Sequence, residues 1–520
     1  MPRILPRLLL LSFFVLTGFD VAGGQTPVNS VQNLTPPPPI RREFRGVWVA
    51  SVENIDWPSI PGLSTREQQE ELLAILDRAV ALRLNAVILQ VRPAADALYA
   101  SPYEPWSEYL TGKMGRAPNP WYDPLEFAVN EAHKRGLELH AWFNPYRARH
   151  PSAKSRPSPN HISVTNPELV RRYGKHLWMD PGEPAVRQHT IKVILDVVTR
   201  YDIDGVHVDD YFYPYKEKDR RGNNIEFPDA SSYRRYRNSG GTLGRDDWRR
   251  ENVDSLIHQL YVRIKATKPW VKFGISPFGT WRPGYPPQMG GQFDSYSELY
   301  GDSRKWVMNG WADYFTPQLY WPTDHPALSY VILLPWWVEQ NLKGRHMWIG
   351  NYVDKVTGTP TGWPAQELLD QIALTRAQRG ATGNVYFSIR SLMYGRDGLP
   401  EKIVAGPYAT RTLVPASTWL DSIPPATPIV RAGRDAGRDV GFGAMAKLSE
   451  AARRDRSLCP RFRTSAAGSL RPVHATPSAS SSIFTPSPSS TLRHARSSKR
   501  ATAPSSTASP CRPGGAAMRR

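Results

Sequence analysis

The sequence predicts an α/β protein: a (β/α)8 TIM barrel with an N-terminal signal peptide and a disordered basic C-terminal tail. Three observations support the barrel. Short β-rich runs alternate with amphipathic helical stretches, and the strands lack a polar outer face, as in a parallel sheet. The alternation repeats eight times, which favours a closed barrel over an open doubly wound sheet. Finally, Gly-x-Gly-x-x-Gly follows none of the strands, which argues against a dinucleotide-binding fold.

The N-terminus has the pattern of an export signal. Arg3 and Arg7 precede an apolar run over 8–16, and the small residues Ala22-Gly23-Gly24 follow it. This order is typical of a signal peptide, here over 1–24. The run is too short to span a bilayer, and no lipobox cysteine follows it. We therefore expect a secreted or periplasmic protein without a transmembrane segment.

The barrel is expected over 43–415, after a proline-rich, extended linker over 25–42. The predicted strands are 43–52, 85–93, 137–146, 205–213, 271–279, 314–321, 346–353 and 383–391. The helices between them carry clear end signals. Ser64 and Glu67 form a capping box, and Asp123 precedes a proline at the first helical position. Gly136 and Gly380 stand where a terminating glycine is expected.

The composition changes after the barrel. Residues 416–430 are interpreted as a remnant of a further domain or a linker. Residues 431–520 are rich in Arg, Ser, Ala, Pro and Thr and hold +13 of the chain's net charge of +19. Such a segment buries too little apolar surface to offset the entropy of ordering, so we expect a disordered tail that can touch anionic surfaces. The weakly charged remainder is not a dedicated nucleic-acid binder.

The candidate site lies at the C-terminal ends of the strands, where parallel barrels hold their active sites. Amides, carboxylates and aromatic rings gather there, and these groups suit a sugar, whose hydroxyls need polar partners and whose C–H face stacks on rings. The candidate substrate-binding residues are Asn54, Asp56, Trp57, Gln90, Arg92, His140, Asn144, His207, Tyr211, Trp281, Gln318, Tyr320, Trp321 and Asn351.

The strand 205–213 gives the sharpest signal. Alternation places Asp209 on the face that looks into the barrel, and a bulge at the end of the strand would turn Asp210 inward as well. Burial and the mutual repulsion of two such carboxylates raise their proton affinity, and general acid–base catalysis requires this. Asp209 and Asp210 are therefore the candidate catalytic residues. The structural alternative is that Asp209 pairs with Arg92 and Asp210 caps a loop. His140 could bind a metal, but no second His stands two residues away and no Cys or Glu cluster accompanies it. We therefore expect no metal or cofactor.

Several segments together resemble the glycosyl hydrolase-like 10 family of secreted bacterial proteins. They are EFRGVWVASVENIDWPS, NAVILQVRPAADALY, LELHAWFNPYR, DGVHVDDYFYP, ISPFGTWR and TPQLYWP, in consistent order over about 43–420. The resemblance implies a TIM barrel related to glycoside hydrolases. For some members it implies cleavage of peptidoglycan glycan strands without stem peptides at the division site. It also implies that the site holds Asp209, Asp210, Asn54, Asp56, Gln90, Arg92, His140, Asn144, Gln318 and Tyr320. Unlike lipoprotein members, this sequence has no anchoring cysteine, and no β-domain is recognisable after the barrel.

The preferred hypothesis is hydrolysis of an N-acetylated glycan, with peptidoglycan strands as the polysaccharide substrate. Glycosidases usually place two carboxylates across the scissile bond, and only one strand offers an obvious inward acid. A non-catalytic glycan-binding barrel therefore stays open, as does an amylase-like glucan hydrolase, although no glutamate follows the fifth strand. DGVHVD is also similar to a chitinase-type strand, where the substrate's acetamido group attacks the anomeric carbon. Tyr211 stands where those enzymes carry glutamate, and Asp210 or Asp56 could supply the proton.

Overall fold

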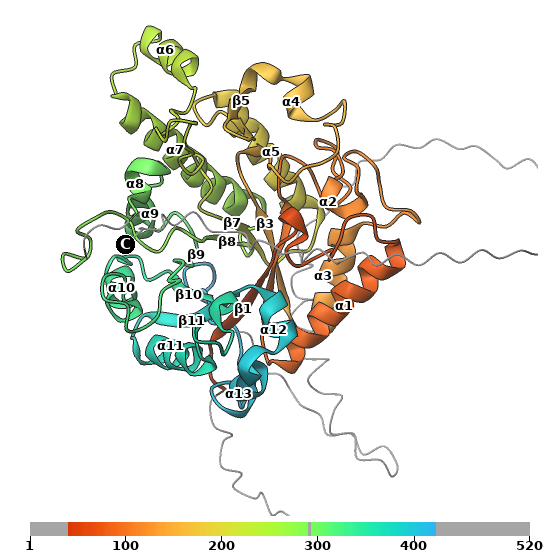
Figure 1. Ribbon diagram of the computed structural model, residues 1–520, viewed down its shortest axis with the longest axis vertical. Coiled ribbons are helices and arrows are strands. Elements are labelled where there is room, and N and C mark those ends of the chain that lie inside the picture. The colour runs from red at the N-terminus through yellow and green to blue at the C-terminus, as the bar shows by residue number, and fades with distance from the viewer. Residues whose placement is uncertain (1–39, 290–292, 423–520) are drawn as a thin grey trace, which may run out of the picture. The chain divides into compact units, whose positions relative to one another are not determined.

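The computed structural model describes residues 40–289 and 293–422. Within them eight parallel strands close into a barrel in the order β1-β11-β10-β9-β8-β7-β3-β2, which confirms the predicted fold class. Helices surround the strands (Figure 1). The predicted signal peptide, most of the linker and the tail lie outside the described residues. No helix of the described ranges is long and apolar enough to cross a membrane.

All eight predicted strands are present. They are β1 (Phe44–Val49), β2 (Ala86–Arg92), β3 (Glu138–Phe143), β7 (Gly205–Val208), β8 (Lys272–Ile275), β9 (Tyr314–Phe315), β10 (His346–Tyr352) and β11 (Ala381–Phe387). Most end before the predicted limit. β7, for example, leaves the ladder after Val208 although the sequence stays β-rich to Tyr213. The residues beyond the strand ends therefore form the loops of the barrel mouth.

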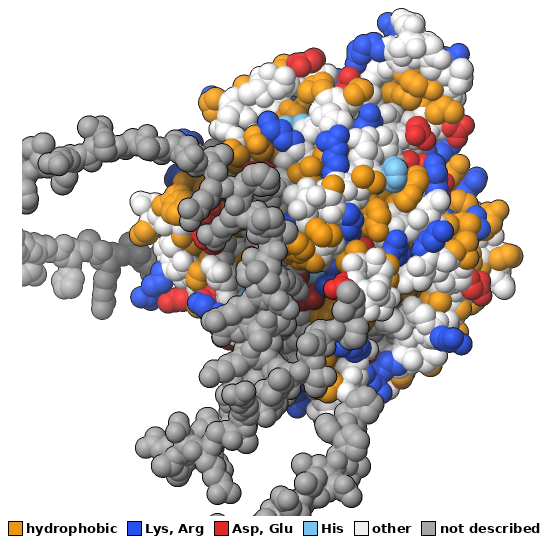
Figure 2. Space-filling view, turned by 180° about the vertical axis from the view of Figure 1, so that it is seen from behind, with side chains coloured by type: hydrophobic (Ala, Val, Ile, Leu, Met, Phe, Trp, Pro, Cys, Tyr) orange, Lys and Arg blue, Asp and Glu red, His pale blue; other side chains and the backbone are white. Residues whose placement is uncertain are grey.

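The longer helices are α1 (Thr65–Ala81), α3 (Pro124–Lys134), α5 (Pro184–Arg200), α6 (Ala230–Asn238), α7 (Arg245–Thr267), α9 (Ser303–Asn309), α10 (Tyr330–Glu339), α11 (Ala365–Ala377) and α13 (Leu399–Ala405). Shorter ones are α2 (Glu108–Thr111), α4 (Ile162–Thr165), α8 (Ser295–Glu298), α12 (Ile389–Tyr394) and the 3-10 turns Val52–Asn54, Pro167–Leu169, Val353–Lys355 and Arg396–Gly398. The predicted caps are confirmed: Ser64 and Glu67 form the capping box of α1, and Asp123 accepts from the first turn of α3. Basic and acidic side chains are interspersed over the visible part of the back face (Figure 2).

A small antiparallel sheet is inserted between β3 and α5, and the sequence analysis did not predict it. It consists of β4 (Arg147–Arg149), β5 (Val170–Tyr173) and β6 (His176–Met179), in the order β4-β6-β5. Trp178 Nε1 donates to Phe212 O (2.9 Å), which ties the sheet to the loop after β7. The insert therefore lies at the mouth of the barrel.

The barrel interior is aromatic but contains a polar column, defined here as Glu138, His140, Tyr314 and His207. The Tyr314 hydroxyl lies 2.8 Å from His140 Nδ1 and 3.1 Å from His207 Nδ1. His140 Nε2 lies 3.1 Å from Glu138 Oε2, and Trp48 Nε1 donates to His207 Nε2 (3.1 Å). Both histidines are fully buried. They support the barrel from inside, and their predicted role in substrate binding stays a prediction.

The chain after α13 returns to the barrel. Leu413 N donates to Arg41 O (3.0 Å), and Glu43 N donates to Leu413 O (2.9 Å), beside the start of β1. Residues 416–422 continue along the protein, and Trp419 Nε1 donates to Asp313 Oδ1 (2.8 Å). This part of the predicted remnant therefore packs against the barrel.

Candidate active site

Asp209 and Asp210 directly follow β7 and are 4% and 3% exposed. Asp209 accepts three kinds of hydrogen bond: from Trp142 Nε1 to Oδ2 (3.1 Å), from Asn144 Nδ2 (3.2 Å to Oδ2) and from Tyr211 N to Oδ1 (3.3 Å). Trp142 and Asn144 stand on and just after β3, the neighbouring strand. All these donors are neutral, so they position the carboxylate without a salt bridge.

Asp210 has a different set of partners from the other side of the mouth. The Tyr215 hydroxyl donates to Oδ2, and Gln318 Nε2 donates to Oδ1 (3.2 Å). Gln318 Nε2 also donates to Ser276 O (3.0 Å), which fixes the amide between β8 and the loop after β9. The two carboxylates are thus held independently, although they are adjacent in sequence.

Burial dominates the electrostatics of this pair. It raises the pKa of Asp209 to about 7, and the negative charge of Asp210 adds to the rise while the Arg147 charge opposes it. Burial also raises the pKa of Asp210, against the hydrogen bonds from Tyr215 and Gln318. With a pKa of about 7, Asp209 can donate and recover a proton near neutral pH, which is the requirement for general acid–base chemistry.

Arg147 is a cation whose charge lowers the pKa of both acids, and the sequence analysis missed it. Its backbone N donates to Asn144 Oδ1 (2.9 Å), and the same Asn144 amide contacts Asp209 through Nδ2. Its guanidinium carbon lies 4.5 Å from the centre of the Tyr211 ring. The predicted pairing of Asp209 with Arg92 is wrong, because Arg92 is bound by Glu104 (Nη2 to Oε1, 2.6 Å).

Half-buried aromatic rings line the other side of the mouth. Tyr320 stacks on Tyr352, with centroids 4.9 Å apart and ring planes at 24°, and lies near Phe387. Trp321 meets Phe278 edge-on at 5.8 Å. Such faces suit the C–H surface of a sugar ring. Tyr320 and Trp321 therefore each lie beside other aromatic rings at the ends of the strands.

The loop after β1 is shaped by three of the predicted residues. Gln90 Oε1 accepts from Val52 N (2.9 Å), and its buried Nε2 has no partner within the described chain. Asn54 Nδ2 donates to Pro58 O (2.8 Å). Asp56 Oδ1 accepts from Ser388 Oγ (2.6 Å), and burial raises its pKa to about 7. These contacts order the loop but leave Asn54 and Asp56 little free hydrogen-bonding capacity.

Three other predicted residues do not face the mouth. Trp57 is fully buried, and its Nε1 donates to Gln68 O (2.9 Å), so it presents no face to a sugar. Asn351 is also fully buried and donates to Gln371 on α11 (2.7 Å), because alternation along β10 turns it outward. Arg92 is fully buried in its pair with Glu104.

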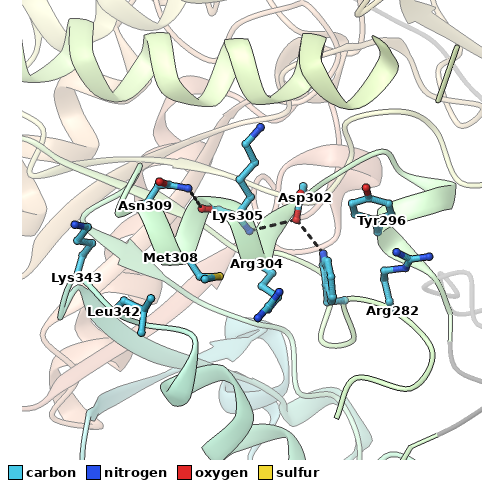
Figure 3. Close-up of a pocket in the computed structure, with 10 residues that line it drawn as sticks. Arg282, Tyr296, Asp302, Arg304, Lys305, Met308, Asn309, Leu342 and Lys343 are labelled. Carbon is cyan, nitrogen blue, oxygen red and sulfur yellow. Dashed lines mark hydrogen bonds between the residues drawn. The ribbon is translucent and has the colours of Figure 1, made fainter. Parts of the chain in front are cut away.

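Trp281 lines a pocket together with residues of α8, α9 and the turn after α10. The other lining residues are labelled in Figure 3. Trp281 Nε1 donates to Asp302 Oδ1 (3.1 Å). The pocket has a volume of about 600 Å³ and is lined by Trp281, Arg282, Tyr296, Asp302, Arg304, Lys305, Met308, Asn309, Leu342 and Lys343. None of these residues is among the described hydrogen-bond partners of Asp209 or Asp210, and the predicted role of Trp281 in substrate binding stays a prediction. Within the described ranges no group of three His, Cys, Asp or Glu side chains is placed to hold a metal ion.

Comparison with known proteins gives consistent matches. A family model described as glycosyl hydrolase-like 10 matches residues 43–361. Glycosyl hydrolase YngK of Bacillus subtilis (strain 168) is 42% identical over 396 residues, which cover 74% of this chain and 76% of that protein. Glycosyl hydrolase DigH of Escherichia coli (strain K12) is 37% identical over 340 residues, covering 61% and 73%. Among solved structures, the PgaB (BpsB) glycoside hydrolase domain from Bordetella bronchiseptica matches with a TM-score of 0.45 and 14% identity, covering 70% of this chain and 98% of that one.

Proposed function

The chain belongs to the glycosyl hydrolase-like 10 family, and from this premise we propose that it hydrolyses an N-acetylated glycan. The substrate we propose is peptidoglycan glycan strands without stem peptides. Asp209 and Asp210 would be the catalytic carboxylates. Asn144, Tyr211, Gln318, Tyr320 and Trp321 would contact the sugar or hold the acids in place.

One observation carries the proposal: two adjacent, buried carboxylates lie at the barrel mouth, and burial raises the pKa of both. Both come from the end of β7, so they approach the scissile bond from one side. Neither has another Asp or Glu among its hydrogen-bond partners in the described residues. This arrangement supports a mechanism in which the substrate supplies the nucleophile, as in some chitinase-like families.

In this mechanism Asp209 donates its proton to the glycosidic oxygen while the bond from that oxygen to the anomeric carbon breaks. The carbonyl oxygen of the substrate's 2-acetamido group attacks the anomeric carbon and forms a cyclic oxazolinium ion. A carboxyl oxygen of Asp210 accepts a hydrogen bond from the acetamido N–H and so aligns this attack. Asp209, now a carboxylate, takes a proton from water as the water opens the ring, with net retention of configuration.

The test is digestion of peptidoglycan sacculi, intact and amidase-stripped, by the purified chain, with mass spectrometry of the soluble products. We expect glycan fragments from stripped strands and none from Asp209→Asn. Asp196→Asn, on α5, where the carboxylate pairs with Arg200, is the matched control and should keep full activity. Protein that pellets with sacculi and releases no fragment would instead be a glycan-binding barrel. Release of glucose oligomers from α-glucan would favour the amylase-like alternative.

A further inference from the structure

Arg147 is unusual among the buried arginines of the described chain. It is 3% exposed, and its side chain makes a single hydrogen bond, from Nη1 to Pro93 O (3.3 Å). Its buried Nε has no partner. A guanidinium has five N–H donors, so most of its hydrogen-bonding capacity is unused.

The other buried arginines show what Arg147 lacks. Arg45, Arg92 and Arg249 are each 0% or 1% exposed, and each has a carboxylate oxygen within 2.7 Å. None of the ion pairs among residues 40–289 and 293–422 includes Arg147. A buried charge without a contacting counter-ion is unfavourable unless a ligand completes it. A carboxylate is the natural complement, because it matches the fork of the guanidinium in two parallel hydrogen bonds.

We propose that Arg147 forms an anion subsite beside the acid pair, with His150 and His176 at its edge, that binds the carboxylate of an acidic sugar. The subsite rests on the proposed glycosidase function and adds a reason for its substrate preference. On a strand without stem peptides, the lactyl carboxylate of each muramic acid is free. On a substituted strand the same carboxyl is an amide and carries no charge.

The location fits a group on the sugar that is being cleaved. Asn144 accepts from Arg147 N through Oδ1 and donates to Asp209 through Nδ2, so one side chain links the subsite to the acid. Tyr211, whose ring lies 4.5 Å from the guanidinium carbon, donates its backbone N–H to the same carboxylate. An anion on Arg147 would therefore lie next to the reacting bond.

The two histidines supply neutral groups at the edge of the subsite. Their ring centroids are 5.4 Å apart, and each side chain is about one-fifth exposed. His150 Nδ1 accepts from Ser152 N (3.3 Å), which leaves its Nε2–H as a donor. His176 Nδ1 lies 2.7 Å from Glu217 Oε1. Burial and the nearby Arg147 charge lower the pKa of both rings, so neither adds charge. His150 can donate its Nε2–H to a bound anion, whereas His176 already donates its N–H to Glu217 and only borders the subsite.

The experiment compares two forms of amidase-stripped glycan strands: one with free carboxylates, and one in which carbodiimide and methylamine have converted them to methylamides. We expect the wild-type chain to cut the free-acid strands with a kcat/KM at least about tenfold higher, as lost charge-assisted hydrogen bonds predict. Arg147→Gln should lose this preference, mainly through KM on the free-acid strands. Arg147→Lys should keep part of it. Arg149→Gln, on the same strand β4, is the matched control and should keep it fully.

Several outcomes would overturn the subsite. One is a wild type that cuts both strands equally, a comparison that needs no variant to fold. Another is an Arg147→Gln variant that loses activity equally on both kinds of strand. Arg147 would then act only by supporting Asp209, and not by binding a carboxylate of the substrate. If the wild type cuts neither strand, the proposed function fails, and co-sedimentation decides the subsite. Stronger retention on free-acid strands would support it, and equal retention would overturn it.

Discussion

Replacing Asp209 with asparagine should stabilise the protein at high pH more than at low pH. Burial raises the pKa of this carboxyl from an ordinary value of 3.8 to about 7. In the wild type the folded state therefore keeps the proton that the unfolded state releases. For an acid whose pKa is raised by folding, this contribution to stability is full below pH 3.8 and is lost as pH rises through 7.

The size of the effect follows from the shift. About three pKa units correspond to about 4 kcal/mol, of which about 3 kcal/mol is lost between pH 5 and pH 8. Asparagine does not ionise, so Asp209→Asn removes this loss. We compare the Tm difference between Asp209→Asn and the wild type at the two pH values. For a barrel of this size, this difference should be about 3 °C more positive at pH 8 than at pH 5. The asparagine amide must also fit among the donors Trp142 and Asn144, which changes stability by the same amount at both pH values. The comparison of the two pH values cancels this effect.

The assay is calorimetry of both proteins at the two pH values, with Asp229→Asn as the control. Asp229 is also fully buried, but it is bound by Arg249 (Oδ2 to Nε, 2.7 Å) and by Arg245. Its replacement should lower Tm at both pH values, because it leaves buried guanidinium groups unpaired. An Asp209→Asn variant whose Tm shift is the same at pH 5 and pH 8 would refute the reasoning that burial keeps this carboxyl protonated.

Three further predictions concern the mouth and its support. Trp142→Phe removes a donor worth about 1.5–3 kcal/mol to Asp209. The pKa of that acid should rise by about one to two units, and the alkaline limb of kcat/KM should shift upward; Trp48→Phe should leave the limb in place. Tyr320→Ala should raise KM for glycan oligomers by roughly threefold to tenfold in steady-state kinetics, and an unchanged KM would remove the ring from the binding surface. Glu104→Gln should lower the unfolding free energy by about 3–5 kcal/mol in urea titrations, because it leaves a buried guanidinium unpaired; a smaller loss would mean that water reaches the site.

The sequence predicted the barrel well because its signals are local. Buried parallel strands appear as apolar runs, and capping residues such as Ser64 and Asp123 act on their own first turns. The ends of strands were less predictable, because a strand stops where its neighbour stops pairing. Val208 ends β7 for this reason, although Tyr211, Phe212 and Tyr213, three to five residues later, have high β propensity.

The site was predicted in part. The acids, Asn144 and Gln318 meet at the strand ends as expected, since alternation and strand polarity determine these positions. Asn351 was wrongly predicted to face the mouth. Side chains alternate along β10, so Asn351 points to the opposite side from its neighbour Gly350, toward the helices. Arg147 was missed because its strand pairs with β6, about thirty residues later. A signal for that insert existed: Gly174, with a positive φ of 53°, turns the chain between two short β-rich runs.

The shortness of β9 has a consequence for how the barrel can open. Tyr314–Phe315 shares two paired positions with β8 and two with β10, and backbone hydrogen bonds at Asp313, Thr316 and Gln318 extend this pairing beyond the strand. The hydroxyl of Tyr314 joins it from inside to His140 on β3 and His207 on β7. Local unfolding that detaches β9 from its neighbours must therefore also break the buried side-chain hydrogen bonds to β3 and β7. Amide exchange at β9 should consequently report on the whole barrel interior, and not on the fraying of one short strand.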